Sequence, residues 1–449
     1  MRETFIPHDF IITIQAVLRK GLRRWFAEIF FAALTVCGTV SAWIRNSSEE
    51  DRYRKFYHYV QRLGRFDETI QSAYAAWLVC SLNNVLQHEA VVRLALDDSP
   101  IKRYGPRIEG AGYMHNPTNI TDKSATCYGH SWVVLSLIVE HMKWGTICLP
   151  LRWSFYVRKD DLEQIDEAIR PKFQTKLQLG IELVKESVAT IRQLTDKALQ
   201  LTFDSGYVSS ELFESMENLG VKIVTRFKKN ARFYQLPERP ARAKRGRPRK
   251  YGEFFDLESW LQSPTEETTI KDVTLYGGPK RVAFKTTLVT TRITGGRPAR
   301  LVASQLVRGG KSGSWSVFVS TDLTATAEEI LVAYSRRFSI EEMFKDLKES
   351  CGLGGQEVRK WESSKACATI AALNYTAVEI WAWERDASEL TALRSPWDEP
   401  KRRPSHKNKR DLLSGKIRVE KYSRIIINAK PDEIRKKILL FARCLGLAG

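Results

Sequence analysis

Cysteine and histidine are scarce in this sequence, and neither occurs in clusters. The 449 residues include 7 Cys and 7 His, and the cysteines are scattered singly, without a Cys-x2-Cys pair or a paired Cys/His spacing. Pairs of that kind mark disulfide frameworks and structural zinc sites. We therefore expect neither feature, and a reducing cytosol is the expected compartment. The sequence also shows no internal repeat, so a repeat architecture is not expected.

Long uncharged apolar runs are also rare, and one segment needs separate treatment. Residues 25–44 read WFAEIFFAALTVCGTVSAWI and follow a basic run, as a signal or membrane helix would. Glu28 interrupts the segment, however, and the uncharged run from Ile29 to Ile44 is short for a membrane span. We expect a buried core helix of an N-terminal helical domain and no membrane partner.

Basic residues are in excess. The chain carries 71 Lys+Arg against 52 Asp+Glu, which gives a formal net charge of +19. Such a charge is typical of proteins that bind nucleic acid or an anionic membrane, and it does not choose between them. With 43% hydrophobic residues and 12 Trp, the chain can form a packed core. Its length suggests two or three domains.

Apolar runs of strand length alternate with helical patterns across residues 89–225. This alternation predicts a mixed α/β core that follows the N-terminal helical domain. The expected strands are 91–99, 130–141, 145–157, 198–207 and 221–227, and the expected helices are 160–198 and 209–220.

A basic loop and a strand-rich stretch follow this core. Between residues 267 and 320, Gly-Gly pairs punctuate strand-like segments at hairpin spacing, which predicts a β-rich insertion. The expected domains are a helical DNA-binding or dimerisation domain at 1–88, the first part of the core at 89–225, the basic loop and β-rich insertion at 226–324, the helical second part of the core at 325–394, and a basic linker with a C-terminal helix at 395–449.

The basic loop contains the stretch KRGRPRKYG at residues 244–252. Its centre, Arg245-Gly-Arg247 followed by proline, is typical of an AT-hook. An extended segment of this type lies in the narrow minor groove of A·T-rich DNA, whose negative potential attracts both arginines. Lys228 and Lys229 add charge at the start of the same loop and are further DNA-binding candidates. A solvated basic loop is the plainer interpretation of the same pattern.

Three carboxylates come directly after apolar strands. Asp97 and Asp98 end one expected strand, and Asp204 ends another within the motif FDSGY. The carboxyl edge of a sheet is where α/β folds place their sites. Aspartate followed by serine also begins ordinary turns, so the position alone leaves both interpretations open.

A predicted helix over residues 327–350 adds a third acid. Its apolar residues from Ile340 to Leu347 form one buried stripe. A single carboxylate among cations on the flank of that stripe suits a metal site in contact with phosphate, although a ladder of salt bridges uses the same spacing. The flanking stripe consists of Tyr334, Arg337, Glu341, Lys345 and Lys348.

Two aspartates and one glutamate are sufficient for phosphodiester chemistry. Mg²⁺ prefers carboxylate oxygens and keeps several of its waters. Two such ions about 4 Å apart can stabilise both the attacking and the leaving oxygen when water or a 3′-hydroxyl attacks phosphorus. We therefore expect two Mg²⁺ ions, for which Mn²⁺ can substitute.

The pattern Tyr334-x2-Arg337-x3-Glu341-x6-Lys348 resembles the signature of the insertion-sequence-4-type superfamily of bacterial DDE transposases, at every position and spacing. The motifs DDS and FDSGY lie upstream in the expected order, and the resemblance covers about residues 90–385. It implies a ribonuclease-H-like catalytic core of the α/β class, with an N-terminal helical domain and a β-rich insertion between the second Asp and the Glu.

Carried over residue by residue, the resemblance implies that Asp98, Asp204 and Glu341 are the catalytic acids and bind the divalent metals. Asp98 is preferred as the first acid because it stands directly before Ser99, where the family usually has Asp-Thr or Asp-Ser. Asp97 remains the alternative.

The resemblance also implies DNA contacts. Tyr334, Arg337 and Lys348 are expected to contact phosphates near the cleaved transposon end. Trp315 lies in the β-rich stretch and is a candidate to stack on a flipped base, although a structural Trp in a strand is the more ordinary interpretation.

The function implied by the resemblance is cut-and-paste DNA transposition, by metal-dependent cleavage at transposon ends followed by strand transfer. The expected partners are double-stranded DNA of the ends and of the target, and a second copy of the chain, because two ends must be cut together. The expected location is the bacterial cytoplasm, at the nucleoid. A domesticated metal-dependent nuclease and a catalytically silent DNA-binding or repressor protein are the alternatives.

Overall fold

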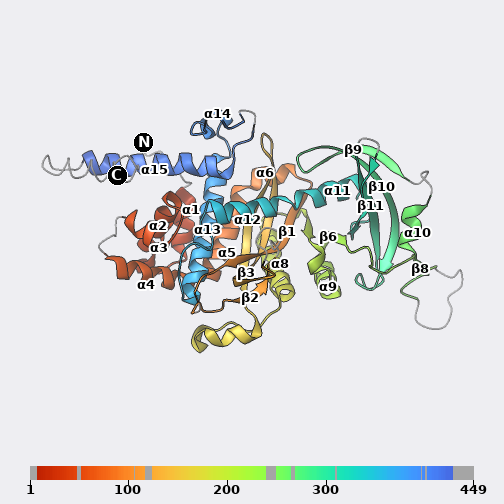
Figure 1. The fold of residues 1–449 in the computed structure, drawn as a ribbon, viewed down its shortest axis with the longest axis horizontal. Coiled ribbons are helices and arrows are strands. Elements are labelled where there is room, and N and C mark those ends of the chain that lie inside the picture. The colour runs from red at the N-terminus through yellow and green to blue at the C-terminus, as the bar shows by residue number, and fades with distance from the viewer. Residues whose placement is uncertain are drawn as a thin grey trace. The chain divides into compact units, whose positions relative to one another are not determined.

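The structure is a computed structural model, and contacts divide the chain into two compact units (Figure 1). The helical unit takes its described residues from Met1–Ala73, Gly105–Ile108 and Lys345–Gly449. The sheet unit takes its residues from Tyr74–Tyr104 and Glu109–Phe344. The described residues are 8–47, 52–105, 107–116, 124–238, 249–263, 268–308, 311–395, 397–399 and 402–427.

The sheet unit is built on a mixed sheet that contains the five expected strands. β1 (Val91–Lys102) lies at its centre, antiparallel to β3 (Thr126–His141) and parallel to β5 (Ala198–Phe203). On one side β4 (Gly145–Tyr156) pairs with β3, and on the other β6 (Val221–Phe227) runs parallel to β5. The apolar runs of these strands are buried, as expected for strands that are covered on both faces. The short strand β2 (Gly112–His115) pairs with the start of β3.

Helix α8 (Lys176–Arg192) packs on β3 and β4 and is shorter than the sequence predicts. The expected helix over 160–198 is wrong in its first half, where the chain forms only short 3₁₀ turns. A capping box explains the late start, because the Thr175 hydroxyl accepts from the Gln178 backbone N–H and the Gln178 side chain accepts from the Thr175 N–H. Helix α9 (Ser210–Asn218) forms within the expected range 209–220.

Beyond β6 the sheet continues into further antiparallel strands, which lie between Asp204 and Glu341 in the chain (Figure 1). β13 (Ser316–Ser320) joins β6 to β11 (Pro298–Arg308), which in turn pairs with β10 (Gly278–Thr291). Smaller elements of this part are β7 (Phe233–Tyr234), β8 (Phe254–Phe255), α10 (Leu257–Gln262), β9 (Thr269–Leu275) and β12 (Lys311–Ser312).

Helix α11 (Ala327–Arg336) packs on these strands through one apolar cluster. The ring of Tyr334 belongs to the cluster and lies 4.9 Å from the ring of Phe318, centroid to centroid. Burial of the ring fixes where the tyrosine hydroxyl can reach, which matters for the site described below.

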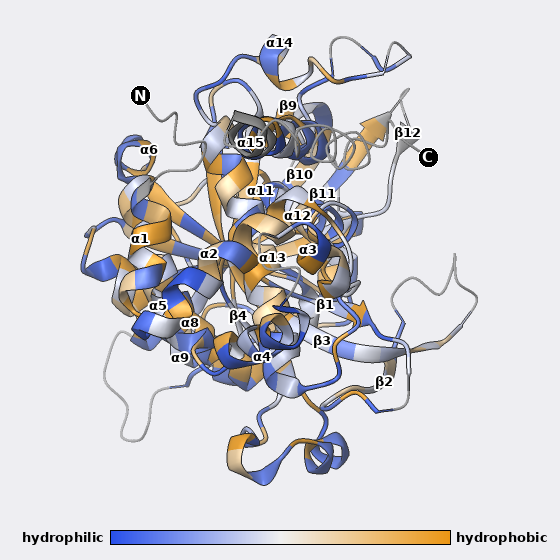
Figure 2. Cartoon of the chain, turned by 90° about the vertical axis from the view of Figure 1, so that its left-hand side faces the viewer, coloured by the Kyte–Doolittle hydropathy of each residue, from blue (hydrophilic) through white to orange (hydrophobic). Residues whose placement is uncertain are grey.

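The helical unit brings the beginning and the end of the chain together. Its central helix α13 (Trp361–Ala382) is buried along nearly its whole length and packs on α4 (Tyr53–Gly64), on α2 (Lys20–Thr35) and on α15 (His406–Ile427). Helix α2 carries charged and apolar residues along its length, which Figure 2 colours blue and orange. Further helices of the described residues include α1 (His8–Ala16), α3 (Val40–Arg45), α5 (Asp67–Ser81), α6 (Asn83–His88) and α14 (Ala387–Leu390).

The apolar segment at 25–44 forms the end of α2 and most of α3, and the prediction of a buried helix there is confirmed. Throughout the described residues, no helix combines the length and the apolar composition that a membrane crossing needs.

Part of the positive charge of α15 stabilises helix ends. Arg410 donates to the carbonyl of Ala33 in α2 (3.4 Å), and the Lys421 ammonium donates to the carbonyl of Asn46, which follows α3 (2.6 Å). Cations at helix C-termini satisfy free carbonyls and oppose the helix dipole. These two charges therefore have a structural use within the helical unit.

Candidate active site

Asp97 and Asp204 come directly after the last residues that pair the parallel strands β1 and β5. The expectation that Asp97 and Asp98 end their strand is wrong, because β1 continues to Lys102 alongside β3. Leu96 on β1 is in register with Phe203 on β5, so the next residue along each strand is an aspartate. Burial is the main cause that raises the pKa of Asp97, and the charges of Asp98 and Asp204 raise it further. The two carboxylates thus face a common region at this edge of the sheet.

The third acid comes from a helix that does not run as the sequence predicts. The expected single helix over 327–350 is wrong, because α11 ends at Arg336 and α12 (Ser339–Glu349) begins three residues later. At the break the Arg337 N–H bonds to the carbonyl of Tyr334 (3.1 Å), and the Ser339 hydroxyl donates to the carbonyl of Arg336 (2.7 Å). A serine that takes a backbone carbonyl competes with regular helix bonding. Glu341 consequently lies in the first turn of a new helix.

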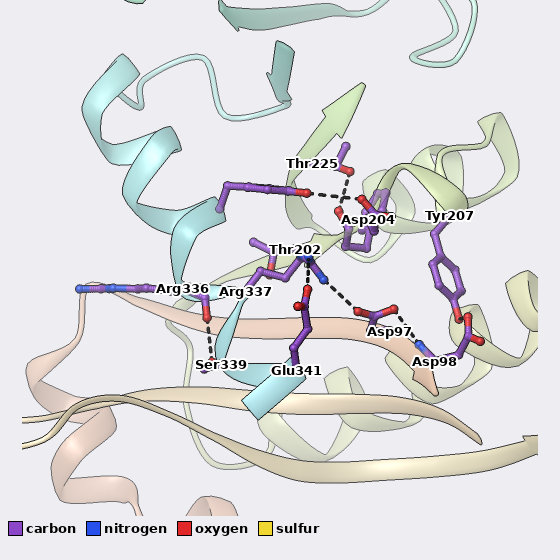
Figure 3. A network of polar contacts seen from close by, with 12 residues as sticks. Asp97, Asp98, Thr202, Asp204, Tyr207, Thr225, Arg336, Arg337, Ser339 and Glu341 are labelled. Atoms are coloured by element: carbon purple, nitrogen blue, oxygen red, sulfur yellow. Dashed lines mark hydrogen bonds and ion pairs between the residues drawn. The ribbon is translucent and has the colours of Figure 1, made fainter. Parts of the chain in front are cut away.

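Arg337 bridges two of the acids (Figure 3). One of its terminal nitrogens donates to Asp97 Oδ2 at 2.8 Å, and the other donates to Glu341 Oε1 at 2.8 Å. Its side chain is only 11% exposed, and its Cζ lies 5.5 Å from the centre of the Tyr334 ring. The Tyr334 hydroxyl makes a long hydrogen bond to Asp204 Oδ1 at 3.5 Å. The structure therefore brings together the alternative acid Asp97 and four residues expected from the sequence, namely Asp204, Tyr334, Arg337 and Glu341.

The charges in this group perturb one another. Burial raises the pKa of Asp97 to about 6, although the Arg337 guanidinium acts to lower it. Burial alone would lower the pKa of Arg337, but Tyr334, Asp97 and Glu341 raise it above its ordinary value. Arg337 thus stays charged, and Asp97 is ionised above about pH 6.

The carboxylate of Asp98 bonds to a different set of residues from that of Asp97. Side chains alternate between the two faces of a strand, so neighbours in sequence face opposite ways. Asp98 Oδ2 accepts from the Lys176 ammonium at 2.6 Å and from the Ser131 hydroxyl at 3.2 Å, and Oδ1 accepts from the Tyr207 hydroxyl at 3.0 Å. Among the two neighbouring aspartates, Asp97 is the one that the structure brings together with Glu341 through Arg337.

Lys176 and Tyr207 are polar residues of this region that sequence reasoning missed. Tyr207 ends the FDSGY motif, and burial together with Asp98 raises its pKa well above the ordinary value. Lys176 is the first residue of α8, directly after the capping Thr175. The capping signal was readable in the sequence, but the pairing across 78 residues with Asp98 was not.

The other predicted DNA-binding residues lie elsewhere. Lys345 is exposed on α12, and Lys348 is half-buried one turn later; both belong to the helical unit. Lys228 and Lys229 are exposed directly after β6, and Trp315 is half-buried directly before β13. Arg245 and Arg247 of the AT-hook-like stretch lie outside the described residues.

The chemistry of the acids fits a divalent cation, but their arrangement contains Arg337. Asp97, Asp204 and Glu341 offer the hard carboxylate oxygens that Mg²⁺ and Mn²⁺ prefer. Across the described residues, no three Asp, Glu, His or Cys side chains are grouped closely enough to hold a metal ion. At this site the guanidinium of Arg337 lies between the carboxylates of Asp97 and Glu341 and bonds to both.

The sequence matches the model of a known protein family. Residues 14–282, more than half of the 449, match the family model described as DDE superfamily endonuclease. The matched range contains Asp97, Asp98 and Asp204 and ends before Glu341. Nucleases of this superfamily typically use divalent metal ions. No curated protein matches the sequence.

Proposed function

This chain belongs to the DDE superfamily of endonucleases, and we propose that it is a DNA transposase that cuts at the ends of a mobile element and joins them to target DNA. The observation that carries the proposal is one group of side chains in which Arg337 bonds to Asp97 and Glu341 and Tyr334 bonds to Asp204. The two aspartates follow the paired parts of β1 and β5, and Glu341 lies in the first turn of α12.

We infer the insertion-sequence-4-type branch from the signature spacing and from the order of elements. The strand order β4-β3-β1-β5-β6, with β1, β5 and β6 parallel, agrees with a ribonuclease-H-like core. The strands from β9 to β13 fall between Asp204 and Glu341 in the chain, where that branch carries its β-rich insertion.

In the proposed mechanism, Asp97, Asp204 and Glu341 hold the divalent metal ions. Asp97 replaces Asp98 as our first acid, because Arg337 links Asp97 to Glu341, whereas Asp98 is bonded to Lys176. When bound, the metal supplies activation of water or a 3′-hydroxyl and stabilisation of the leaving oxygen. The protein's own part is to present ionised carboxylates at the strand ends and to bind the phosphates of the DNA end.

The remaining expected contacts belong to the same proposal. Tyr334 and Arg337 bind phosphates near the cleaved bond, since guanidinium groups recognise phosphate in a bidentate manner. A second copy of the chain is proposed because two DNA ends must be cut together. The nucleoid is the proposed location because the substrate is DNA. Further DNA contacts are proposed for Lys345, Lys348, Lys228, Lys229, Arg245, Arg247 and Trp315.

The test uses purified protein, Mg²⁺ and a labelled duplex that carries the element's own end. The wild type should cut at the end, and Glu341→Gln and Asp97→Asn should each lower cleavage by at least about 100-fold, equivalent to about 3 kcal/mol of transition-state stabilisation. Asp98→Asn should retain more activity than Asp97→Asn. Duplex binding should survive in all three variants.

The outcomes separate the alternatives. Joining of the cut end to an added target plasmid supports the transposase, and cleavage without joining supports a nuclease. Binding without cleavage by the wild type, in Mg²⁺ and in Mn²⁺, would refute the proposal in favour of a DNA-binding protein. Loss of cleavage in Asp98→Asn but not in Asp97→Asn would restore Asp98 as the first acid.

A further inference from the structure

Arg337 makes charged hydrogen bonds to two of the three acids at once. Its two terminal nitrogens lie 2.8 Å from Asp97 Oδ2 and 2.8 Å from Glu341 Oε1. Hydrogen bonds between ionised partners are roughly twice as strong as neutral ones, and a guanidinium is well suited to making two in parallel. The guanidinium therefore holds these two carboxylates in the way that a bridging cation would.

A metal ion and Arg337 compete for the same oxygens. Mg²⁺ holds its ligand oxygens at about 2.0–2.1 Å in near-octahedral geometry, so a metal ion that takes Asp97 Oδ2 or Glu341 Oε1 crowds the guanidinium bonded to the same atom. The two cations would also repel each other, and solvent screens this repulsion little because the Arg337 side chain is 11% exposed.

Deprotonation cannot relieve this competition. Arginine remains protonated at any pH at which a protein is folded. Arg337 must therefore move away from the carboxylates, and a nearly buried cation moves readily only when another anion accepts it. A phosphate diester is such an anion, because it offers two oxygens in the geometry that a guanidinium prefers.

We propose that Arg337 closes the metal site of the DNA-free protein, and that the DNA phosphates open it by taking Arg337 away from Asp97 and Glu341. Metal and DNA then bind cooperatively, and the site becomes able to cut only when the substrate is present. This inference rests on the proposed function and adds a sequence of events to it.

The experiment measures Mn²⁺ binding without DNA, by the electron paramagnetic resonance signal of the free ion at pH 8. Arg337→Gln removes the bridging cation and should bind Mn²⁺ at least about fivefold more tightly than the wild type, the lower end of ordinary coupling between two ligands. Arg336→Gln is the matched control, because the neighbouring Arg336 pairs with Glu140 (3.5 Å) and not with the acids. It should bind Mn²⁺ as the wild type does.

A second arm adds a saturating 20-base-pair duplex of arbitrary sequence to both proteins. In the wild type the phosphates now hold Arg337, so the ratio of the Mn²⁺ affinities of Arg337→Gln and wild type should fall toward one. Should Arg337→Gln fail to fold by circular dichroism, Arg337→Lys replaces it. A lysine keeps the charge but cannot reach both carboxylates, so a smaller increase is expected.

Failure of the inference and failure of the proposed function give different results. If the wild type binds Mn²⁺, Glu341→Gln does not, and Arg337→Gln binds no more tightly than the wild type, Arg337 does not close the site and the proposed function stands. If no variant binds Mn²⁺ with or without duplex, the metal site itself is absent and both proposals are overturned.

Discussion

Replacing Glu379 by Gln should strongly destabilise the helical unit, because Glu379 is the anion of a buried charged network. It lies on α13, is 3% exposed, and accepts from His406 Nδ1 at 2.7 Å and from the Lys409 ammonium at 2.5 Å. Both partners are on α15, and the His406 ring stacks on the Tyr375 ring with centroids 4.4 Å apart. Glutamine keeps the volume but leaves two buried cations without a counter-charge.

The expected loss is about 3–5 kcal/mol of unfolding free energy, as for other buried ion pairs that lose one partner. Burial alone would raise the pKa of Glu379, but Lys409 and His406 lower it to about 2. Burial alone would lower the pKa of His406, but Cys351 and Glu379 raise it to about 9. At about 1.4 kcal/mol per pKa unit, either shift corresponds to about 3 kcal/mol. The two figures describe largely the same interaction and are not added.

The pH dependence has a defined sign. The lowered pKa of Glu379 contributes stability above its ordinary pKa of 4.5, and this is lost as the pH falls toward 2. The raised pKa of His406 contributes stability below pH 6.5, and this is lost as the pH rises through 9. In Glu379→Gln the acidic loss from this network should disappear, and His406 should titrate at a lower pH.

Urea unfolding followed by circular dichroism from about pH 2 to about pH 9 measures both effects. Glu389→Gln is the control, since Glu389 bonds to Lys416 (2.7 Å) and Arg385 (2.9 Å) but is 36% exposed. Exposed pairs contribute about 0–1 kcal/mol, so the control should change little. A loss below about 1 kcal/mol in Glu379→Gln, or one equal to that of the control, would refute the reasoning for the buried network.

Two further substitutions test the packing of each unit by urea unfolding. Lys285 is 2% exposed and donates to three oxygens at the end of α10 at 2.8–3.0 Å, so Lys285→Met should cost about 1–3 kcal/mol through the loss of these hydrogen bonds, and an unchanged midpoint would contradict this. In the helical unit, a Cβ on Gly64 would lie 1.8 Å from the carbonyl oxygen of Glu362, so Gly64→Ala should destabilise by about 1–3 kcal/mol. Gly21→Ala in α2 meets nothing within 4 Å and should be neutral or slightly stabilising.

The strands of the core were predictable because burial on both faces gives them continuous apolar runs. β1, β3, β4, β5 and β6 all form where strands were expected, although β1 continues past Asp97 and Asp98 to Lys102 and β5 ends at Phe203, directly before Asp204. Helix limits were harder to predict. The break between α11 and α12 depends on a hydroxyl bond from Ser339, and serine occurs in many uninterrupted helices. The late start of α8 depends on the capping box at Thr175, whereas the charged residues before it favoured an earlier start.

Contacts between distant parts of the chain were beyond prediction for a different reason. The helical unit combines Met1–Ala73 with Lys345–Gly449, and the Glu379 network shows that buried charges help to fix α15. The sequence predicted a basic linker followed by a C-terminal helix at 395–449, but α15 begins at His406, within the basic stretch expected to be the linker. Composition does not distinguish a lysine that faces solvent from Lys409, which is 4% exposed.

Asp97 and Asp98 illustrate how one step along a strand separates two roles. Both follow the same apolar run, and the preference for Asp98 came from the serine after it. In the structure Lys176 compensates Asp98, whereas Asp97 and Glu341 share the Arg337 guanidinium and Asp204 accepts from the Tyr334 hydroxyl. Three carboxylates and one arginine leave two negative charges uncompensated when all three acids are ionised. A divalent cation and a DNA phosphate that arrive together satisfy both halves of this group, since the metal takes the carboxylates and the phosphate takes Arg337. With the metal alone, the nearly buried Arg337 loses its two carboxylate partners, and a DNA phosphate restores an anionic partner, which is the electrostatic reason to expect that they bind together.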